Sequence, residues 1–234
     1  MKGVLDMPRL RPAIALAALG LIAGSPATIS LADTPKGNPM TTTALAQPVA
    51  DTIATYMPAG YREIARRPVT VDKEGAELVR YERTDGRNAA LGGEHFSTVV
   101  ANNGRLKGFA RMDLDLVGGE LPSREQAQAI AMSFLREAAP DLLPVLKISW
   151  VDPHDEPLRV IRNGVTKNLT LTGMKVKMRN TADGLWMWVI VGADRKVMVF
   201  ERDIHWITFP GKRGTEKWLH DAWLAEKGHS VRPS

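Results

Sequence analysis

The chain has 234 residues, of which 44% are hydrophobic and 24% are charged, which is the composition of an ordinary globular protein. Its 31 lysines and arginines outnumber its 26 acidic residues, so the net charge is +5. Cysteine is absent, which excludes disulfides, thiolate metal sites, cysteine nucleophiles and thioether haem attachment.

The N-terminus has the three parts of a secretory signal peptide. Three basic residues precede an apolar run, Ala13–Ala23, and the small-x-small triplet Ser30–Ala32 follows. The run is shorter than the ~20 residues that span a bilayer. We therefore expect residues 1–32 to be cleaved after Ala32, with synthesis starting at Met1 or Met7. The remainder is expected in the periplasm or the medium, with no membrane span.

The first half of the remaining chain alternates strand and turn signals. Residues 33–48 are rich in Thr, Pro and Gly and predict a flexible leader. A short helix is expected next, ending before Pro58. Turn residues such as Asn103 and Gly104 then separate apolar or alternating segments. These segments predict strands over residues 68–71, 78–83, 96–101 and 106–116.

The strongest helix signal lies in the middle of the chain. Ser123 is a suitable N-cap, Gln126 completes a capping box, and Pro140 ends the segment. Apolar residues from Ala127 to Leu135 recur on one stripe. Beyond this helix, the pattern predicts strands over 147–151, 158–161, 174–179, 185–191 and 197–203, and a last helix over 215–227.

Both halves of the chain have the same predicted order of elements, one helix followed by antiparallel strands. Aligning residues 103–111 with 194–202 matches Phe109 with Phe200. We predict an α+β fold in which a helix packs on an antiparallel sheet, in two repeated α-plus-four-strand units. These units span 49–119 and 120–209, and a C-terminal helix and tail span 210–234. A single larger α+β domain is the alternative.

The helix sequence LPSREQAQAIAMSFL, followed by strands and by the hairpin WVIVGADRKVMVF, resembles the PepSY domain, most clearly over residues 120–205. The resemblance implies a helix on an antiparallel sheet, an extracytoplasmic location and a non-enzymatic binding role. PepSY domains occur in propeptides of secreted peptidases, where inhibition or modulation of peptidases is proposed. No peptidase domain follows in this sequence, so we expect any inhibition to act on a separate protein.

The sequence contains few signals of chemistry. No nucleophile elbow, zinc-protease helix or phosphate-binding loop occurs, and we expect neither catalysis nor a cofactor. Asp152, His154 and Asp155 are candidate ligands for a divalent cation, but a solvated turn between strands is the simpler explanation, because contiguous acids usually face water. Asp113 and Asp115 are expected on one strand face, as an acid–base pair or as solvated carboxylates. The lysines and arginines form no patch typical of nucleic-acid binding.

Two neighbouring strands carry the most informative pattern. On one strand, the apolar side chains of Trp186, Trp188 and Ile190 share a face. On the other, the cations Lys175, Lys177 and Arg179 share a face. A helix covers only one face of an open sheet. The tryptophan face is therefore covered by the C-terminal helix, through Trp218 and Leu219, or buried in a core that the two units share, or exposed to a partner.

These patterns favour an exported, non-catalytic binding protein. In this hypothesis the tryptophan face contacts a protein partner, such as a peptidase that it modulates, and the basic residues attract acidic surfaces. The alternative is a periplasmic protein that binds a small ligand or a metal ion. The oligomeric state is left open.

Overall fold

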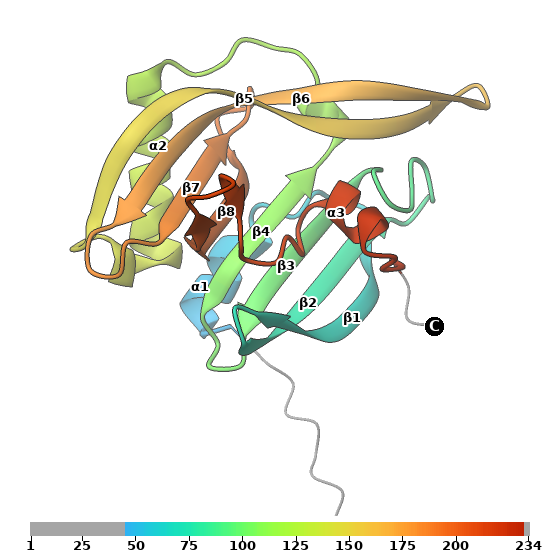
Figure 1. Ribbon diagram of the computed structural model, residues 1–234. Coiled ribbons are helices and arrows are strands. Elements are labelled where there is room, and N and C mark those ends of the chain that lie inside the picture. The colour runs from blue at the N-terminus through green and yellow to red at the C-terminus, as the bar shows by residue number, and fades with distance from the viewer. Residues whose placement is uncertain (1–44, 232–234) are drawn as a thin grey trace, which may run out of the picture. The chain divides into compact units, whose positions relative to one another are not determined.

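The computed structural model describes residues 45–231, which belong to one compact unit, Thr41–Ser234. An eight-stranded antiparallel sheet forms its centre, and helices α1 and α2 pack on one face (Figure 1). The fold class is thus α+β. The predicted signal peptide and the leader up to residue 44 lie outside the described residues. Helix α1, Gln47–Ala54, begins inside the predicted leader, which is therefore too long at its end.

The first four strands form a meander. They are β1 (Tyr61–Val71), β2 (Glu74–Arg83), β3 (His95–Ala101) and β4 (Leu106–Met112). The turn predicted at Asn103 and Gly104 joins β3 to β4, and Gly104 has the positive φ of 81° that such turns require. The strand predicted over 106–116 is wrong beyond Met112. Asp113 instead caps a short 3₁₀ helix, Leu114–Leu116, by accepting a hydrogen bond from the Asp115 N–H at 2.9 Å.

The last four strands of the sheet form a second meander. They are β5 (Leu146–Arg162), β6 (Val165–Asn180), β7 (Trp186–Val191) and β8 (Val197–Ile204). The strand order is β1-β2-β3-β4-β8-β7-β6-β5, so the meanders meet where Phe109 pairs with Phe200. The turn predicted around His154 is wrong, because β5 runs through it. An edge strand tolerates Pro153 and Pro157, whose missing N–H groups a central strand would need.

Helix α2, Arg124–Ala138, confirms the prediction from its capping box. The Ser123 hydroxyl accepts from the Gln126 N–H, and the Gln126 side chain accepts from the Ser123 N–H. The apolar stripe of α2 packs on the sheet, and Phe134 lies with its ring centroid 5.1 Å from that of Phe200 and 5.7 Å from that of Phe109. Within residues 45–231, no helix combines the length and apolar character needed to cross a membrane.

The opposite face of the sheet is covered by two segments from the second half of the chain. The outer parts of β5 and β6, residues 154–173, extend as a hairpin that we call the arm (Figure 1). Leu158 and Leu171 of the arm belong to a second buried apolar cluster with Met112, Trp188 and Leu219. Residues 205–229 add β9 (Trp206–Ile207), β10 (Lys212–Arg213) and helix α3 (Asp221–Glu226).

Helix α3 is shorter than the predicted helix over 215–227. The preceding residues bond to other elements instead of forming a helical turn. The Thr215 hydroxyl donates to Asp72 and accepts from the His205 N–H, and the Trp218 indole donates to the Thr70 carbonyl at 2.8 Å. These tertiary hydrogen bonds fix residues 215–218 against the sheet, and the helix begins only at Asp221.

Candidate functional site

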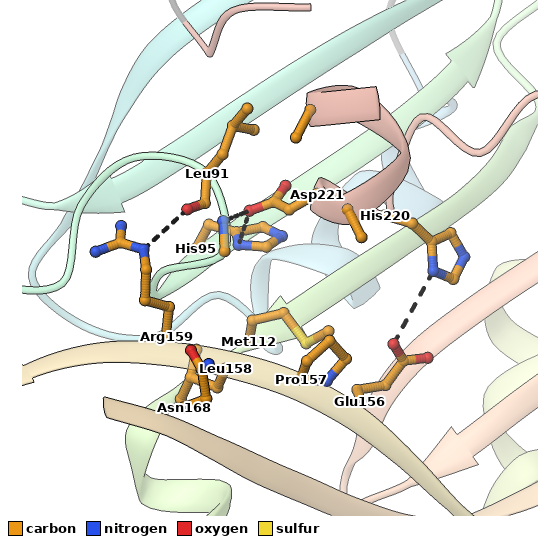
Figure 2. A pocket seen from close by; sticks show the side chains of 13 residues that line it. Leu91, His95, Met112, Glu156, Pro157, Leu158, Arg159, Asn168, His220 and Asp221 are labelled. Atoms are coloured by element: carbon orange, nitrogen blue, oxygen red, sulfur yellow. Dashed lines mark hydrogen bonds and ion pairs between the residues drawn. The ribbon is translucent and has the colours of Figure 1, made fainter. Parts of the chain in front are cut away.

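A cavity of about 340 Å³ lies between the arm, the sheet and α3 (Figure 2). This volume is at the lower end of the range of small-molecule sites. Most of its wall is apolar and comes from Leu91, Met112, Pro157, Leu158, Ala222 and Ala225. Its polar lining residues are His95, Glu156, Arg159, Asn168, His220 and Asp221.

His95, at the start of β3, lines this cavity and has a buried ring nitrogen without a hydrogen-bond partner among residues 45–231. Its side chain is nearly fully buried, with 2% of its surface exposed. Nδ1 lies 2.9 Å from the Gly93 carbonyl oxygen, which only accepts, so Nδ1 carries the proton. In the neutral ring Nε2 then holds a lone pair, and it has no hydrogen-bond partner among residues 45–231. Burial and the nearby Arg80 charge lower the pKa of His95 to about 4, so the ring is neutral near pH 7.

Asp221, on the first turn of α3, holds this arrangement in place. Its carboxylate accepts two hydrogen bonds from the Arg80 guanidinium, at 2.7 and 3.0 Å, and one from the Gly92 N–H at 2.6 Å. One carboxylate oxygen lies 3.5 Å from His95 Nδ1. Burial alone raises the pKa of Asp221, but His95 and Arg80 outweigh it and hold the pKa below its usual value. The charged carboxylate therefore favours the tautomer with Nδ1 protonated.

The loop between β2 and β3 is fastened to the arm. The Arg159 guanidinium donates to the Leu91 carbonyl at 3.1 Å and to the Ala89 carbonyl at 2.6 Å, and the Arg159 N–H donates to the Gly92 carbonyl at 2.7 Å. On the arm, the Ile161 N–H donates to the Asn88 side chain at 2.7 Å. These contacts make the loop and the arm one connected wall, so the cavity is preorganised.

A buried charge network lies beside the cavity. Glu201 accepts from the Trp188 indole at 3.0 Å, from His220 Nε2 at 2.9 Å and from Arg213 at 2.7 Å. Burial alone raises the pKa of Glu201, but the cations Arg213 and His220 outweigh it and hold the pKa well below its usual range. Nδ1 of His220 lies 4.0 Å from Glu156, as Figure 2 shows. The Glu201 carboxylate is therefore paired with Arg213 and with His220.

The structure buries most of the predicted tryptophan face. Trp188 and Ile190 are buried in the cluster that the arm and Leu219 complete, and Trp186 is half-buried. The cover expected from the C-terminal segment is present, and the arm adds to it. Trp188 and Ile190 are therefore inaccessible to a partner in this structure.

The predicted basic residues stack on the tryptophans of the neighbouring strands. Lys175 Nζ lies 4.2 Å from the Trp188 ring centroid, and Lys177 Nζ lies 4.3 Å from that of Trp186. The Arg179 guanidinium lies 5.5 Å from the Trp186 ring. These are cation–π distances, so the cations and the rings stabilise one another across the sheet.

The three candidate metal ligands have other partners. Asp152 accepts from Arg124 at 2.7 Å, Asp155 accepts from the Thr172 hydroxyl at 2.7 Å, and His154 Nε2 lies 3.3 Å from Glu156. Successive strand residues point to opposite faces, which separates Asp155 from the other two. Among residues 45–231, no three His, Asp or Glu side chains are placed to hold a metal ion.

The His95–Asp221 pair could not be predicted from the sequence. The two residues come from β3 and α3, far apart in the sequence, and no spacing rule links them. His220 and Asp221 adjoin in sequence, but they contact Glu201 and His95 respectively. The local sequence, Gly92-Gly93-Glu94-His95, is common in loops and carries no signal of a site.

No protein-family model, curated protein or solved structure gives a significant match to this chain. The resemblance to the PepSY domain thus stays a prediction.

Proposed function

We propose that this is a non-catalytic binding protein that holds a small, mainly apolar molecule in the cavity. An N–H or O–H group of the ligand donates to His95 Nε2. The proposal rests on the Nε2 lone pair of His95, which is buried without a partner among residues 45–231 and belongs to a residue that lines the cavity. A buried acceptor without a partner costs about 1–3 kcal/mol, and a ligand donor would remove this cost.

The surroundings of His95 favour an uncharged ligand. The walls are mainly aliphatic, which suits an apolar body. The polar wall carries charges of both signs, the carboxylates of Glu156 and Asp221 and the guanidinium of Arg159, so it favours neither an anion nor a cation overall. Both carboxylates already have cationic partners, so a cationic ligand would gain little from them.

Two features support binding rather than turnover. With a pKa of about 4, His95 is a weak general base near pH 7. Among the described residues that line the cavity there is no Ser, Thr, Tyr or Lys to act as a nucleophile. The sequence left open a protein that binds either a small ligand or a metal ion. These observations favour the small ligand.

We further propose that the chain consists of two repeated α-plus-four-strand units and is exported. Each half of the chain contributes one helix and a four-strand meander, and Phe109 pairs with Phe200 at the junction. This arrangement supports two repeated units. Export depends on the signal-peptide pattern. Modulation of a peptidase depends on the PepSY resemblance alone. The contact surface expected for it at Trp188 and Ile190 is buried.

The test uses matched pairs of probes that differ in one donor. Titration calorimetry of the full chain would compare indole with 1-methylindole, and 4-methylphenol with 4-methylanisole. One neutral hydrogen bond is worth about 1 kcal/mol, so the donor-bearing member should bind about fivefold more tightly. In His95→Phe the ring remains but the acceptor is gone, and this preference should disappear.

A pair of variants on α3 ties the binding to the cavity. Ala225 is an exposed residue of α3 that lines the cavity, so Ala225→Trp should block binding. Glu226 is exposed beside it and does not line the cavity, so Glu226→Trp should bind normally. Equal affinity within each probe pair, or normal binding by Ala225→Trp, would contradict the proposal.

A further inference from the structure

A second surface, which shares no lining residue with the cavity, exposes large aromatic rings. Phe209, in the turn between β9 and β10, is 91% exposed, Trp206 is 43% exposed, and Trp150 is 38% exposed. The Lys177 ammonium lies 5.5 Å from the rings of both Trp150 and Trp206, which places them together. We call Trp150, Trp206 and Phe209 the aromatic patch.

Unpaired cations surround the aromatic patch. On the sheet these are Lys147, Lys177 and Arg179, and on the β9–β10 hairpin Lys212 follows the turn. None of the four forms an ion pair among residues 45–231. Two carboxylates lie close by, that of Asp183 in the groove beside Arg179 and that of Asp152, which pairs with Arg124. Asp183 offsets one of the four cations, so the patch is positive overall.

This combination matches the chemistry of a bilayer surface with anionic lipids. Trp rings favour the headgroup level of a membrane, and lysines and arginines near an anionic surface strengthen binding to it. Phe209 projects from the turn, and the tip sequence Thr-Phe-Pro-Gly carries no charge that would oppose insertion. A projecting uncharged tip with cations behind it suits a soft interface better than a flat protein surface.

We propose that the aromatic patch docks the protein onto a bilayer surface containing anionic lipids. Phe209 enters the acyl boundary, Trp150 and Trp206 lie at headgroup level, and the cations face lipid phosphates. The same surface would attract an acidic protein, and the experiment below separates the two partners.

Vesicle co-sedimentation tests the proposal with the full chain. The vesicles are phosphatidylcholine alone or mixed equally with phosphatidylglycerol. Binding should require phosphatidylglycerol and weaken as salt rises. Phe209→Ser should weaken binding about tenfold, as expected for losing one apolar side chain from the membrane. Val165→Ser, at the tip of the arm where Val165 is 57% exposed, is the matched control and should bind normally.

A charge-reversal pair tests the electrostatic part. Lys212→Glu should weaken binding to the mixed vesicles severalfold. Lys167→Glu makes the same change of charge on the exposed arm and should have little effect. Equal losses in the two variants would overturn the proposed orientation.

A local probe removes any contribution that residues 1–44 make to vesicle binding. The chain has no cysteine, so Thr208→Cys carries a single environment-sensitive fluorophore beside Phe209. Its emission should shift to the blue with mixed vesicles, whereas the same label at Val165→Cys should not shift. No shift at residue 208, or equal shifts at both positions, would overturn the proposal. Tighter binding to polyglutamate than to the vesicles would also overturn it, in favour of an acidic protein partner.

Discussion

On the face that carries α1 and α2, the sheet buries a large apolar cluster that includes Phe96, Phe109 and Phe200, with the buried cations Arg111 and Arg202 at its margin. On the opposite face, beneath the arm and the C-terminal segment, charged residues such as Arg80 and Glu201 are buried among apolar ones. The first face is a packed core. The second has paired charges, a cavity and a free acceptor. Buried polar groups demand specific partners, so the second face has the features of a binding site.

The largest effect should come from the apolar face. Phe134 is fully buried between the rings of Phe109 and Phe200, so Phe134→Ala should lower the free energy of unfolding by about 4 kcal/mol. Denaturant unfolding measures this loss. The neighbouring Ser133 is exposed, and Ser133→Ala should change the stability by less than about 0.5 kcal/mol. A loss below about 1 kcal/mol in Phe134→Ala would mean that this face is not the main core.

Breaking the charge network on the other face should cost nearly as much. Glu201→Gln leaves the buried Arg213 guanidinium without its counter-charge and should lower the free energy of unfolding by about 3 kcal/mol. Because the pKa of Glu201 is held well below its usual range, its contribution is present above about pH 4.5 and is lost as the pH falls. The gap between wild type and variant should therefore narrow in acid. A gap that is constant with pH would contradict this account.

The lowered pKa of His95 predicts a second change of stability with pH, at higher pH than the change caused by Glu201. The unfolded state takes up a proton near pH 6.5 and the folded state only near pH 4, so acidification through this window favours unfolding. Relative to His95→Phe, the wild type should lose about 3 kcal/mol of stability between pH 6.5 and 4.

The difference in stability between the wild type and His95→Phe does not depend on the titration of His220. Burial alone lowers the pKa of His220, but Glu201 outweighs it and raises the pKa, so its contribution is lost as the pH rises. Because His220 is present in both proteins, its effect cancels. Parallel stability curves for wild type and His95→Phe from pH 6.5 to 4 would show that His95 titrates normally.

The smallest effect should come from the N-terminus of α2. Ser123→Ala removes the hydroxyl that accepts from the Gln126 N–H and should cost about 1 kcal/mol in unfolding free energy. Ser123→Asp restores an acceptor and should recover most of this loss. If Ser123→Ala leaves the melting temperature unchanged, the capping box contributes nothing measurable.

The sequence predicted the parts of the fold that depend on neighbouring residues. The limits of α2 follow from Ser123 and Pro140, and the β3–β4 turn follows from Asn103 and Gly104. The error at Pro153 has a physical reason: prolines end central strands but are tolerated on an edge, and edge position depends on the topology.

The candidate site was beyond the reach of local patterns. His95, Asp221 and Arg159 come from three elements that meet only after the arm folds over the sheet. Trp188 and Ile190 were recognised as an unusual apolar face, but only the tertiary structure showed what covers them.

The most direct test of the central claim is the ¹⁵N chemical shift of His95 Nε2, measured by long-range ¹H–¹⁵N NMR near pH 7 before and after addition of indole. We predict an unprotonated Nε2 whose resonance moves toward the hydrogen-bonded range as indole saturates the site, with Nδ1 protonated throughout. A protonated Nε2 in the free protein, or a resonance that stays fixed at indole saturation, would contradict the proposed site.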